Sequence, residues 1–421
     1  MPELRTSAWY GDELLELELP PEWDVEVVRP DTPARLGDDE IAAALEHPIG
    51  QAPLRELARG RRRCTILVDD LTRPTPVGRI LPHALRQLAD AGVVEEEVTL
   101  VVASGAHRPG DHASALRKLG GAGERCRVLV HDARAPTKLL GRTALGTPVR
   151  VNTVVAEADL VVGIGGVYPQ HSLGFGGGAK LALGVLAERS IARLHYRHGT
   201  VGGTHDVDND FRRDLDEVAR IVGLRTTVAA HVDADRELVR VVAGDHERYF
   251  PDAVAFSRRA FAAPHPGDAD VVIANAYPSD VSLTFALSKG QVPLVRAAPH
   301  ASRVLVAACP EGAGLHRLFP NVAPPRLARA RHAYLIARHR PGDTLAVATR
   351  VLERRRYSGT APARRPIHLY VPSDARLPAH VTPTRDWQEV VSAIVEEQSD
   401  RERIRALVYA CAPLQVVGAA Q

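Results

Sequence analysis

Nitrogen-bearing side chains surround a glycine-rich segment in the middle of the chain. His171 precedes Gly174 and Gly176–Gly178, and Lys180 follows them. Glycines let backbone N–H groups approach a ligand closely and adopt φ values that a side chain disfavours. A further imidazole, His195, lies at the far end of the helix expected after Lys180. This spacing predicts an anion-binding loop that offers a nitrogen nucleophile and a metal ligand.

Residues in and just before this segment partly match two nucleotide-binding motifs, and neither match is complete. Residues 174–180 have the separation of a P-loop, but Ala179 replaces its second glycine and Leu181 replaces the hydroxyl residue that binds magnesium. Residues 163–168 begin like a dinucleotide-binding motif, but Tyr168 stands in the place of the third glycine. A flexible glycine loop with an incidental lysine is the alternative that needs no ligand.

Polar segments also follow two other predicted strands. A buried strand at 64–70 ends in Asp70 and leads to Arg73, and another at 98–103 leads to His107. A third strand, at 160–166, precedes the glycine segment. Alternation with helices indicates a mostly parallel sheet with ligands at the carboxyl ends of its strands, so the three loops should share one rim. Two histidines on that rim suit acid/base chemistry near neutral pH.

The length predicts two α/β domains, each a mostly parallel sheet flanked by helices. A chain of 421 residues exceeds the usual size of one hydrophobic core. We expect an N-terminal catalytic domain over residues 1–262 and a C-terminal domain over 263–411, with the tail 412–421 able to return to the first domain. Strands of the second domain are predicted at 271–275, 304–308, 333–337 and 367–371. The site is expected in the cleft between the domains.

Composition favours a small substrate rather than a polymer or a membrane. Lys+Arg 53 and Asp+Glu 51 give a formal net charge of +2, which does not argue for nucleic acid or an anionic membrane surface. The four cysteines are scattered without a C-x-x-C pair, which suggests reduced thiols and a cytoplasmic location. Neither a signal peptide nor a membrane span is expected.

Several segments in sequence order resemble the lactate racemase family, the nickel-pincer nucleotide enzymes. The resemblance rests on Asp70-Leu-Thr-Arg-Pro-Thr-Pro76, Ser104-Gly-Ala-His-Arg108, the run from His171 to Lys180, Ser190-Ile-Ala-Arg-Leu-His195, Ala276-Tyr-Pro-Ser-Asp280 and Pro310-Glu-Gly-Ala-Gly314. It extends through most of the chain, and the order of several motifs is far more specific than any one of them.

The resemblance implies a cofactor derived from nicotinic acid, whose pyridinium ring carries two sulfur groups and binds nickel through carbon. Lys180 would form a thioamide to it, and His195, with His198 as the alternative, would bind the nickel. Imidazole and soft sulfur suit nickel. Further cofactor contacts are expected from Asp70, Thr72, Gly176, Gly177, Gly178 and Lys289.

The implied reaction is racemisation or epimerisation of a 2-hydroxy acid. One histidine takes the hydroxyl proton while the α-hydride passes to the cofactor, and the hydride then returns to the opposite face. His107 and His171 match the paired bases, and Arg73 suits the substrate carboxylate. Asp70 is expected to orient a neighbouring group or the cofactor, or else to cap the turn that follows its strand.

One departure from the family pattern bears on the substrate. A glutamine commonly stands three residues before the later lysine, whereas this chain has Ala286 before Lys289. We therefore expect a 2-hydroxy acid other than lactate, with Phe285 shaping an apolar pocket. Another redox isomerisation on the same cofactor and a non-catalytic binder of the nucleotide or nickel are the alternatives. The expected partners are cofactor-building enzymes, and self-association is left open.

Overall fold

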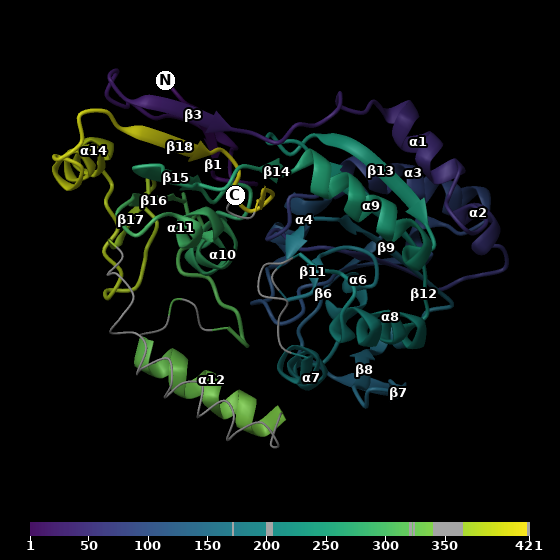
Figure 1. Cartoon of the computed structure of the whole chain (residues 1–421). Helices are drawn as coiled ribbons and strands as arrows, with labels where there is room; N and C mark the ends of the chain where they lie inside the picture. The colour runs from purple at the N-terminus through teal and green to yellow at the C-terminus, as the bar shows by residue number, and fades with distance from the viewer. Residues whose placement is uncertain (171, 199–204, 320–321, 323–324, 340–364, 419–421) are drawn as a thin grey trace. The chain divides into compact units, whose positions relative to one another are not determined.

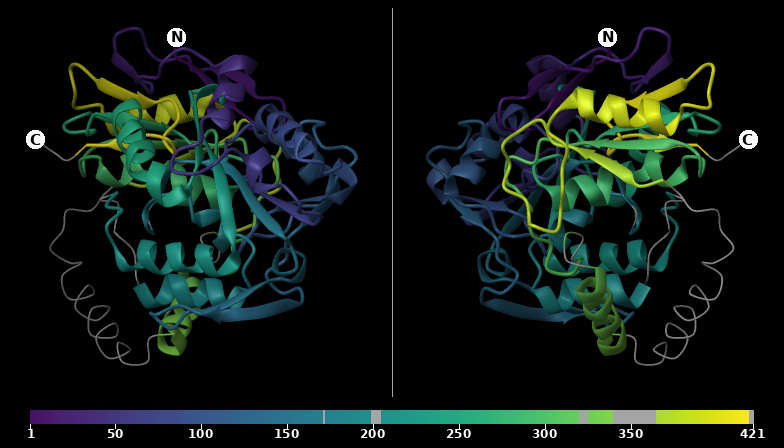
Figure 2. Two further views of the ribbon diagram at one scale, coloured as in Figure 1. Left: turned by 90° about the vertical axis from the view of Figure 1, so that its right-hand side faces the viewer. Right: turned by 90° about the vertical axis from the view of Figure 1, so that its left-hand side faces the viewer.

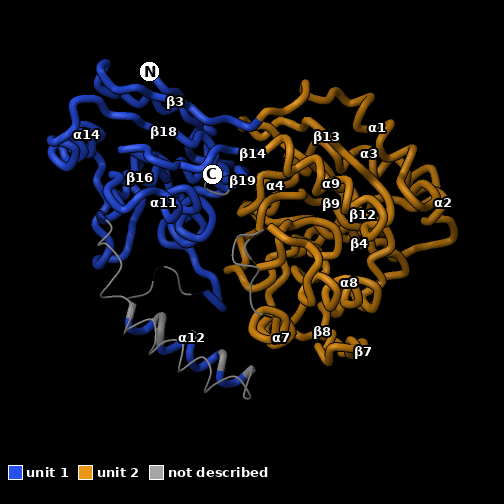
Figure 3. The backbone as a smooth tube through the Cα atoms, viewed as in Figure 1, with its two compact units in different colours: residues 1–30, 262–421 blue, residues 31–261 orange. Residues whose placement is uncertain are grey.

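The computed structural model describes residues 1–170, 172–198, 205–319, 322, 325–339 and 365–418 (Figure 1). The contacts within the chain divide it into two units, residues 31–261 and residues 1–30 with 262–421 (Figure 3). The first 30 residues, assigned from sequence to the N-terminal domain, thus group with the other unit. The interdomain position of the site stays a prediction.

Two strand pairings explain why both ends of the chain join the second unit. Strand β3 (Asp24–Val28) pairs in parallel with β18 (Arg405–Tyr409). Near the C-terminus, β19 (Val416–Val417) pairs with β14 (Ala262–Ala263), so the described part of the tail belongs to this unit and does not return to residues 31–261. Asp280 also binds the N-terminal segment, because its carboxylate accepts the N–H groups of Ser7 and Ala8 at 2.8 and 3.2 Å.

Residues 31–261 contain a six-stranded sheet in the order β13-β12-β9-β4-β5-β6. The three strands predicted to carry the site are β4 (Cys64–Val68), β5 (Val98–Val102) and β9 (Leu160–Gly166). They are adjacent and parallel, with Cys64 opposite both Val98 and Leu160. Their carboxyl ends therefore meet at one edge, as the sequence pattern predicts. The outer strands are β6 (Arg127–Val130), β12 (Leu224–Val232) and the antiparallel β13 (Leu238–Gly244).

Helices pack against this sheet because their apolar residues recur at helical spacing. In α8 (Asp210–Val222) the buried side chains include Phe211, Leu215 and Val218. Its first turn is capped by Asn209, and it ends at Gly223 with φ 81°. The other elements of this unit are α1 (Asp38–Glu46), α2 (Leu54–Leu57), α3 (Val77–Asp90), α4 (His112–Leu119), β7 (Thr137–Arg142), β8 (Pro148–Asn152), α5 (Thr153–Ala156), β10 (Pro169–Gln170), β11 (Gly174–Phe175) and α9 (His246–Ala260).

The single helix expected from Lys180 to His195 is instead two helices. They are α6 (Lys180–Leu183) and α7 (Glu188–His198). The break begins at Gly184, where a Cβ atom would lie 2.6 Å from the carbonyl oxygen of Ala103. The carbonyl of Gly184 in turn accepts the N–H of Gly105 at 2.8 Å. This close approach joins the segment after Lys180 to the loop that carries His107.

The second unit contains the parallel five-stranded sheet β17-β16-β15-β18-β3. Helix α14 (Trp387–Glu397) covers one face of it, as the yellow helix in Figure 2, while α10 (Leu283–Phe285) and α11 (Val292–Arg296) pack on the other. Strands β15 (Val271–Asn275), β16 (Ser302–Val306) and β17 (Ile367–Tyr370) lie where sequence predicted strands. The remaining elements are β1 (Glu3–Thr6), β2 (Glu13–Glu16) and a π-helix at Ala286–Gly290.

The predicted strand at 333–337 is wrong, because these residues lie within helix α12 (Pro325–His339). A short apolar run does not distinguish a strand from a helix segment by periodicity alone. Here the surrounding alanine, leucine and arginine residues are strong helix formers. Among the described helices, none is both long and apolar enough to cross a membrane.

Candidate active site

The loops after β4 and β5 meet in a hydrogen bond between Asp70 and His107. Nδ1 of His107 lies 2.6 Å from Oδ2 of Asp70, and both side chains are largely buried. Thr72 donates its N–H and its hydroxyl to the other carboxylate oxygen. Asp70 therefore both closes the turn and orients the imidazole. The predicted roles of capping residue and orienting residue are combined in one side chain.

The charges around this pair fix its protonation. Burial raises the pKa of Asp70, but His107, Arg73 and Thr72 outweigh it and hold the pKa of Asp70 well below its usual range. Burial lowers the pKa of His107, and Arg73 and Lys180 lower it further, while Asp70 opposes them. We infer an ionised Asp70 that accepts the Nδ1 proton of a neutral His107. Nε2 is then the unprotonated ring nitrogen, which can act as a base.

A second carboxylate, Asp69, secures the base of the same loop. The fully buried amine of Lys118 lies 2.7 Å from its Oδ1, and Thr75 donates to Oδ2 at 2.6 Å. Lys118 also donates to the carbonyl of Arg73 at 2.9 Å. The N–H of Gly166, at the end of β9, reaches Asp69 at 3.3 Å. This ion pair therefore ties the Arg73 loop to a neighbouring strand end.

The glycine segment adopts a conformation that favours glycine at three positions. Gly174, Gly177 and Gly178 have φ of 83°, 86° and 56°. A Cβ atom at Gly174 would lie 2.3 Å from the carbonyl oxygen of Asp206, and one at Gly177 would lie 2.6 Å from Cγ2 of Val167. The predicted backbone need for glycine is confirmed at these three positions but not at Gly176, where a Cβ atom would lie 3.6 Å from its nearest neighbour. Its anion-binding role stays a prediction.

Lys180 lies directly after this segment, partly buried at the first residue of α6. Burial, together with the positive charges of Arg73 and Arg212, lowers the pKa of Lys180 to about 7, against the opposing charge of Asp70. Arg73 and Asp70 thus act on both His107 and Lys180. A lysine with this pKa is about half unprotonated at neutral pH and can act as a nucleophile.

Arg212 and Lys118 are two site residues that the sequence analysis missed. Arg212 is 5% exposed and donates to the carbonyls of Phe175 and Gly177. Both charged residues occupy positions on the apolar side of their helices: Lys118 is three residues after buried Ala115, and Arg212 precedes buried Leu215 by three. A charge on the buried side of a helix is the sequence signal that could have found them.

The two candidate nickel ligands on α7 have different surroundings. His195 is 9% exposed and lies edge-on to the Phe211 ring, with centroids 5.0 Å apart. Nε2 of His198 lies 2.7 Å from the buried carboxylate of Asp214, which also accepts the hydroxyl of Thr147. This pairing leaves Nε2 of His198 less available to a metal, and it fixes the last turn of α7 against α8.

The described residues contain no group of three or more His, Cys, Asp or Glu side chains placed to hold a metal ion. His171, the predicted second base, lies outside the described residues. The proposed pairing of His107 with His171 stays a prediction.

Phe285 and Lys289, the predicted contacts from the second unit, lie on consecutive helical turns. Phe285 is 5% exposed and packs with Ala8, Tyr277 and Val281. Lys289 is partly buried in the π-helix, a helix type often found at functional sites. Their predicted roles toward substrate and cofactor are not settled by these contacts.

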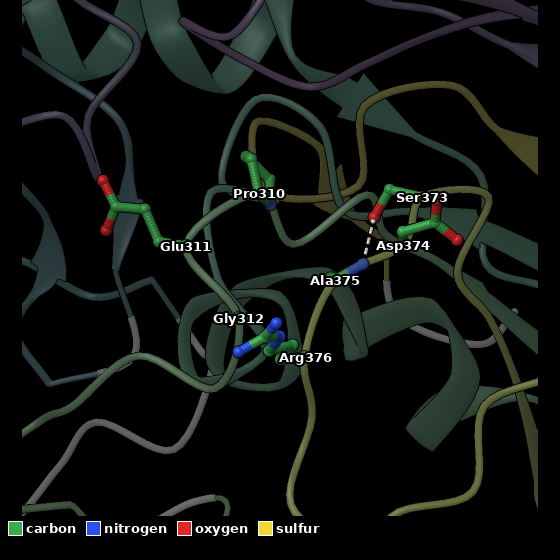
Figure 4. Close-up of a pocket in the computed structure, with 7 residues that line it drawn as sticks. All are labelled: Pro310, Glu311, Gly312, Ser373, Asp374, Ala375 and Arg376. Carbon is green, nitrogen blue, oxygen red and sulfur yellow. Dashed lines mark hydrogen bonds between the residues drawn. The ribbon is translucent and has the colours of Figure 1, made fainter.

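A separate depression of about 530 Å³ lies in the second unit (Figure 4). It is formed by Pro310–Gly312 and Ser373–Arg376, and none of the predicted catalytic side chains lines it. The hydroxyl of Ser373 accepts the N–H of Ala375 at 3.2 Å, and the Glu311 side chain points away from Ser373. The Pro310 motif of the sequence analysis thus builds this depression.

Comparison with known proteins identifies related sequences over most of the chain. Residues 10–204 match the lactate racemase N-terminal domain. A lactate racemase of Lactiplantibacillus plantarum is 26% identical over 300 residues, 69% of this chain and 70% of that protein. One from Thermoanaerobacterium thermosaccharolyticum is 27% identical over 302 residues, again 69% of this chain and 70% of that protein.

Solved structures share the fold. The lactate racemase apoprotein from Thermoanaerobacterium thermosaccharolyticum matches with a TM-score of 0.71 and 21% identity, over 99% of this chain and 100% of that one. A protein from Thermotoga maritima matches with a TM-score of 0.56 and 13% identity, over 93% and 99% of the two chains. The chain is thus similar in sequence to lactate racemases, and it shares the fold of one of them.

Proposed function

We propose that the chain is a racemase or epimerase of a 2-hydroxy acid that carries a nickel-pincer nucleotide on Lys180. The observation that carries this proposal is the Asp70–His107 pair, which lies in the same electrostatic environment as Lys180 and Arg73. An oriented imidazole, a lysine that is partly unprotonated near neutral pH and a guanidinium are the groups that such a reaction needs. The similarity to lactate racemases supports the same assignment.

The residues present suit the proposed cofactor. Lys180 offers an amine that can form a thioamide, and the glycine segment offers a backbone that a Cβ atom would obstruct. His195 is the proposed metal ligand, and His198, whose Nε2 lies beside Asp214, is the alternative. When bound, the nickel-bearing pyridinium ring would supply an acceptor for the α-hydride of the substrate.

The chain's own residues would bind the substrate and move its proton. Arg73 would hold the substrate carboxylate, and Nε2 of His107 would take the hydroxyl proton as a general base. Asp70 would stabilise the imidazolium that forms, through the hydrogen bond at Nδ1. His171 would serve the opposite face, so that either enantiomer can react.

Intact mass spectrometry tests the attachment site. Protein produced together with the cofactor-building enzymes should exceed the mass of the apoprotein by one nucleotide adduct, and peptide mapping should place it on Lys180. Lys180→Arg should abolish the adduct, whereas the matched change Lys138→Arg, on exposed β7, should retain it. Absence of an adduct from wild-type protein would exclude the covalent cofactor.

A panel of chiral 2-hydroxy acids tests the reaction itself. Loaded protein should interconvert the enantiomers of at least one member, and His107→Ala should retain the adduct but lose the interconversion. We propose a substrate other than lactate, because Ala286 replaces the glutamine common in the family and is fully buried beside Phe285. Conversion of a 2-hydroxy acid to a different constitutional isomer would favour the alternative, another redox isomerisation.

A further inference from the structure

The Arg212 side chain is hydrogen-bonded to the backbone of the glycine segment, although Arg212 lies more than 30 residues later in the chain. Its Nη1 donates to the carbonyl of Gly177 at 3.3 Å, and its Nη2 donates to that of Phe175. The same Gly177 carbonyl accepts the N–H of Lys180 at 3.2 Å. One backbone oxygen thus joins the buried guanidinium to the lysine.

Among the described residues, no carboxylate binds the Arg212 guanidinium directly. Its described partners are the two carbonyls and the Phe250 ring, whose centroid lies 4.1 Å from the guanidinium carbon. Asp216, one helical turn later, acts on it only through space. Burial lowers the pKa of Arg212 to about 10, so the guanidinium remains positive at neutral pH. An unneutralised, buried charge exerts a strong field on its neighbours.

The charges that act on the amine of Lys180 come from two elements. Arg73 and Asp70 belong to the loop after β4, and Arg212 belongs to α8. Burial is the largest influence against the protonated form of Lys180, and two positive charges against one negative charge add to it. Of the two positive groups, Arg212 is the one whose position is fixed by hydrogen bonds to the Lys180 segment itself.

We propose that Arg212 is a positioning residue for Lys180, which fixes the carbonyls of the glycine segment and places a positive charge near the lysine amine. This inference rests on the proposed function, in which the reactive amine of Lys180 is the attachment point of the cofactor. In the attachment step, the nitrogen of Lys180 would form a C–N bond to the thiocarboxyl carbon of the cofactor. The C–OH bond of that group, in its protonated form, would break, and the hydroxyl would leave as water with the one proton lost by nitrogen.

Competitive acetylation of the apoprotein tests this role without cofactor or substrate. Trace acetic anhydride at a series of pH values, followed by complete labelling with the deuterated reagent, gives the reactivity of Lys180 by peptide mass spectrometry. Exposed Lys138 is the internal reference. Wild-type Lys180 should be half-maximally reactive near the pKa of about 7. Arg212→Gln keeps amide donors and removes the charge, so this midpoint should rise by about one pH unit and labelling at pH 7 should fall about fivefold.

Two further variants separate charge from structure. Arg212→Lys keeps the charge and should keep the midpoint close to that of the wild type. Arg213→Gln removes the same charge from the next residue of α8, which is exposed and pairs with Asp208 and Asp210, and should change nothing. A folded Arg212→Gln protein with the wild-type midpoint, or an equal shift in Arg213→Gln, would overturn the proposal. If Arg212→Gln does not fold, a raised midpoint in Arg212→Lys, where the charge is kept, would overturn it instead.

The outcome is distinguishable from a failure of the proposed function. If Lys180 is labelled as expected but wild-type protein never acquires the nucleotide, the attachment proposal fails and the role of Arg212 stands. If the nucleotide attaches while Arg212→Gln leaves the reactivity unchanged, the role of Arg212 fails alone.

Discussion

Replacing Asp70 by asparagine tests the central hydrogen bond of the site with almost no change in shape. The atoms joined by this bond, Oδ2 of Asp70 and Nδ1 of His107, lie 2.6 Å apart in a largely buried place. A hydrogen bond to a charged group contributes roughly 1.5–3 kcal/mol. Since about 1.36 kcal/mol corresponds to a tenfold change in rate, kcat should fall by roughly 10- to 150-fold. KM should change less, because Arg73 is the proposed carboxylate ligand.

The variant should also shift the pH dependence in a defined direction. The negative charge of Asp70 raises the pKa of His107 against burial, so its loss should lower that pKa further. The acidic limb of kcat/KM should then move to lower pH. The asparagine amide can donate a proton to Nδ1, which would place the ring proton on Nε2 and remove the basic lone pair. Nitrogen NMR of the imidazole in the apoprotein should detect this change of tautomer.

The kinetic assay is racemisation of the substrate identified from the panel, with loading measured by intact mass for each variant. Asp111→Asn is the matched control, because Asp111 is an exposed N-cap of α4 and asparagine caps a helix equally well. A fully loaded Asp70→Asn enzyme with kcat within about threefold of wild type and an unshifted acidic limb would refute the assigned role, since general-base catalysis is typically worth 10²–10⁴-fold.

Two further predictions concern stability and are measured by urea denaturation of the apoprotein. Gly177→Ala should cost about 2 kcal/mol or more, because a Cβ atom at φ 86° would lie 2.6 Å from Val167, whereas Gly146→Ala, with φ 80° but open space, should cost less. Lys118→Met should cost about 3–5 kcal/mol by leaving Asp69 buried without its cation. The double variant Asp69→Asn, Lys118→Met should recover part of that loss, and an additive loss would contradict the ion-pair argument.

The sequence predicted the sheet of residues 31–261 because its central strands are continuous apolar runs with polar residues directly after them. β4, β5 and β9 are parallel neighbours, so Asp70 and His107 had to emerge at the same edge. Their hydrogen bond itself was not predictable, because strand spacing fixes an edge but not a side-chain rotamer. The sequence predicted that Asp70 either orients a neighbouring group or caps a turn, and its hydrogen bonds to His107 and Thr72 do both.

What the sequence could not supply depends on contacts between distant segments. Periodicity carries no information about which strand lies beside β3, so the return of residues 1–30 to the second sheet was missed. The break at Gly184 depends on the close approach of Ala103, eighty residues earlier. In the sequence, Arg212 is one of several charged residues in an amphipathic helix. Its burial is explained by the carbonyls of Phe175 and Gly177, which accept hydrogen bonds from the guanidinium and come from a distant segment.

The local charges of the site explain why the overall composition says little about its ligand. The whole chain has a formal net charge of only +2, yet Arg73 and Arg212 both act on Lys180 in a region where Asp70 is the opposing carboxylate. Such a cluster attracts an anion and, when no anion is bound, disfavours protonation of its own lysine. Attraction of a carboxylate and reactivity of Lys180 therefore have the same electrostatic origin. A substitution that weakens one by removing a positive charge should weaken the other.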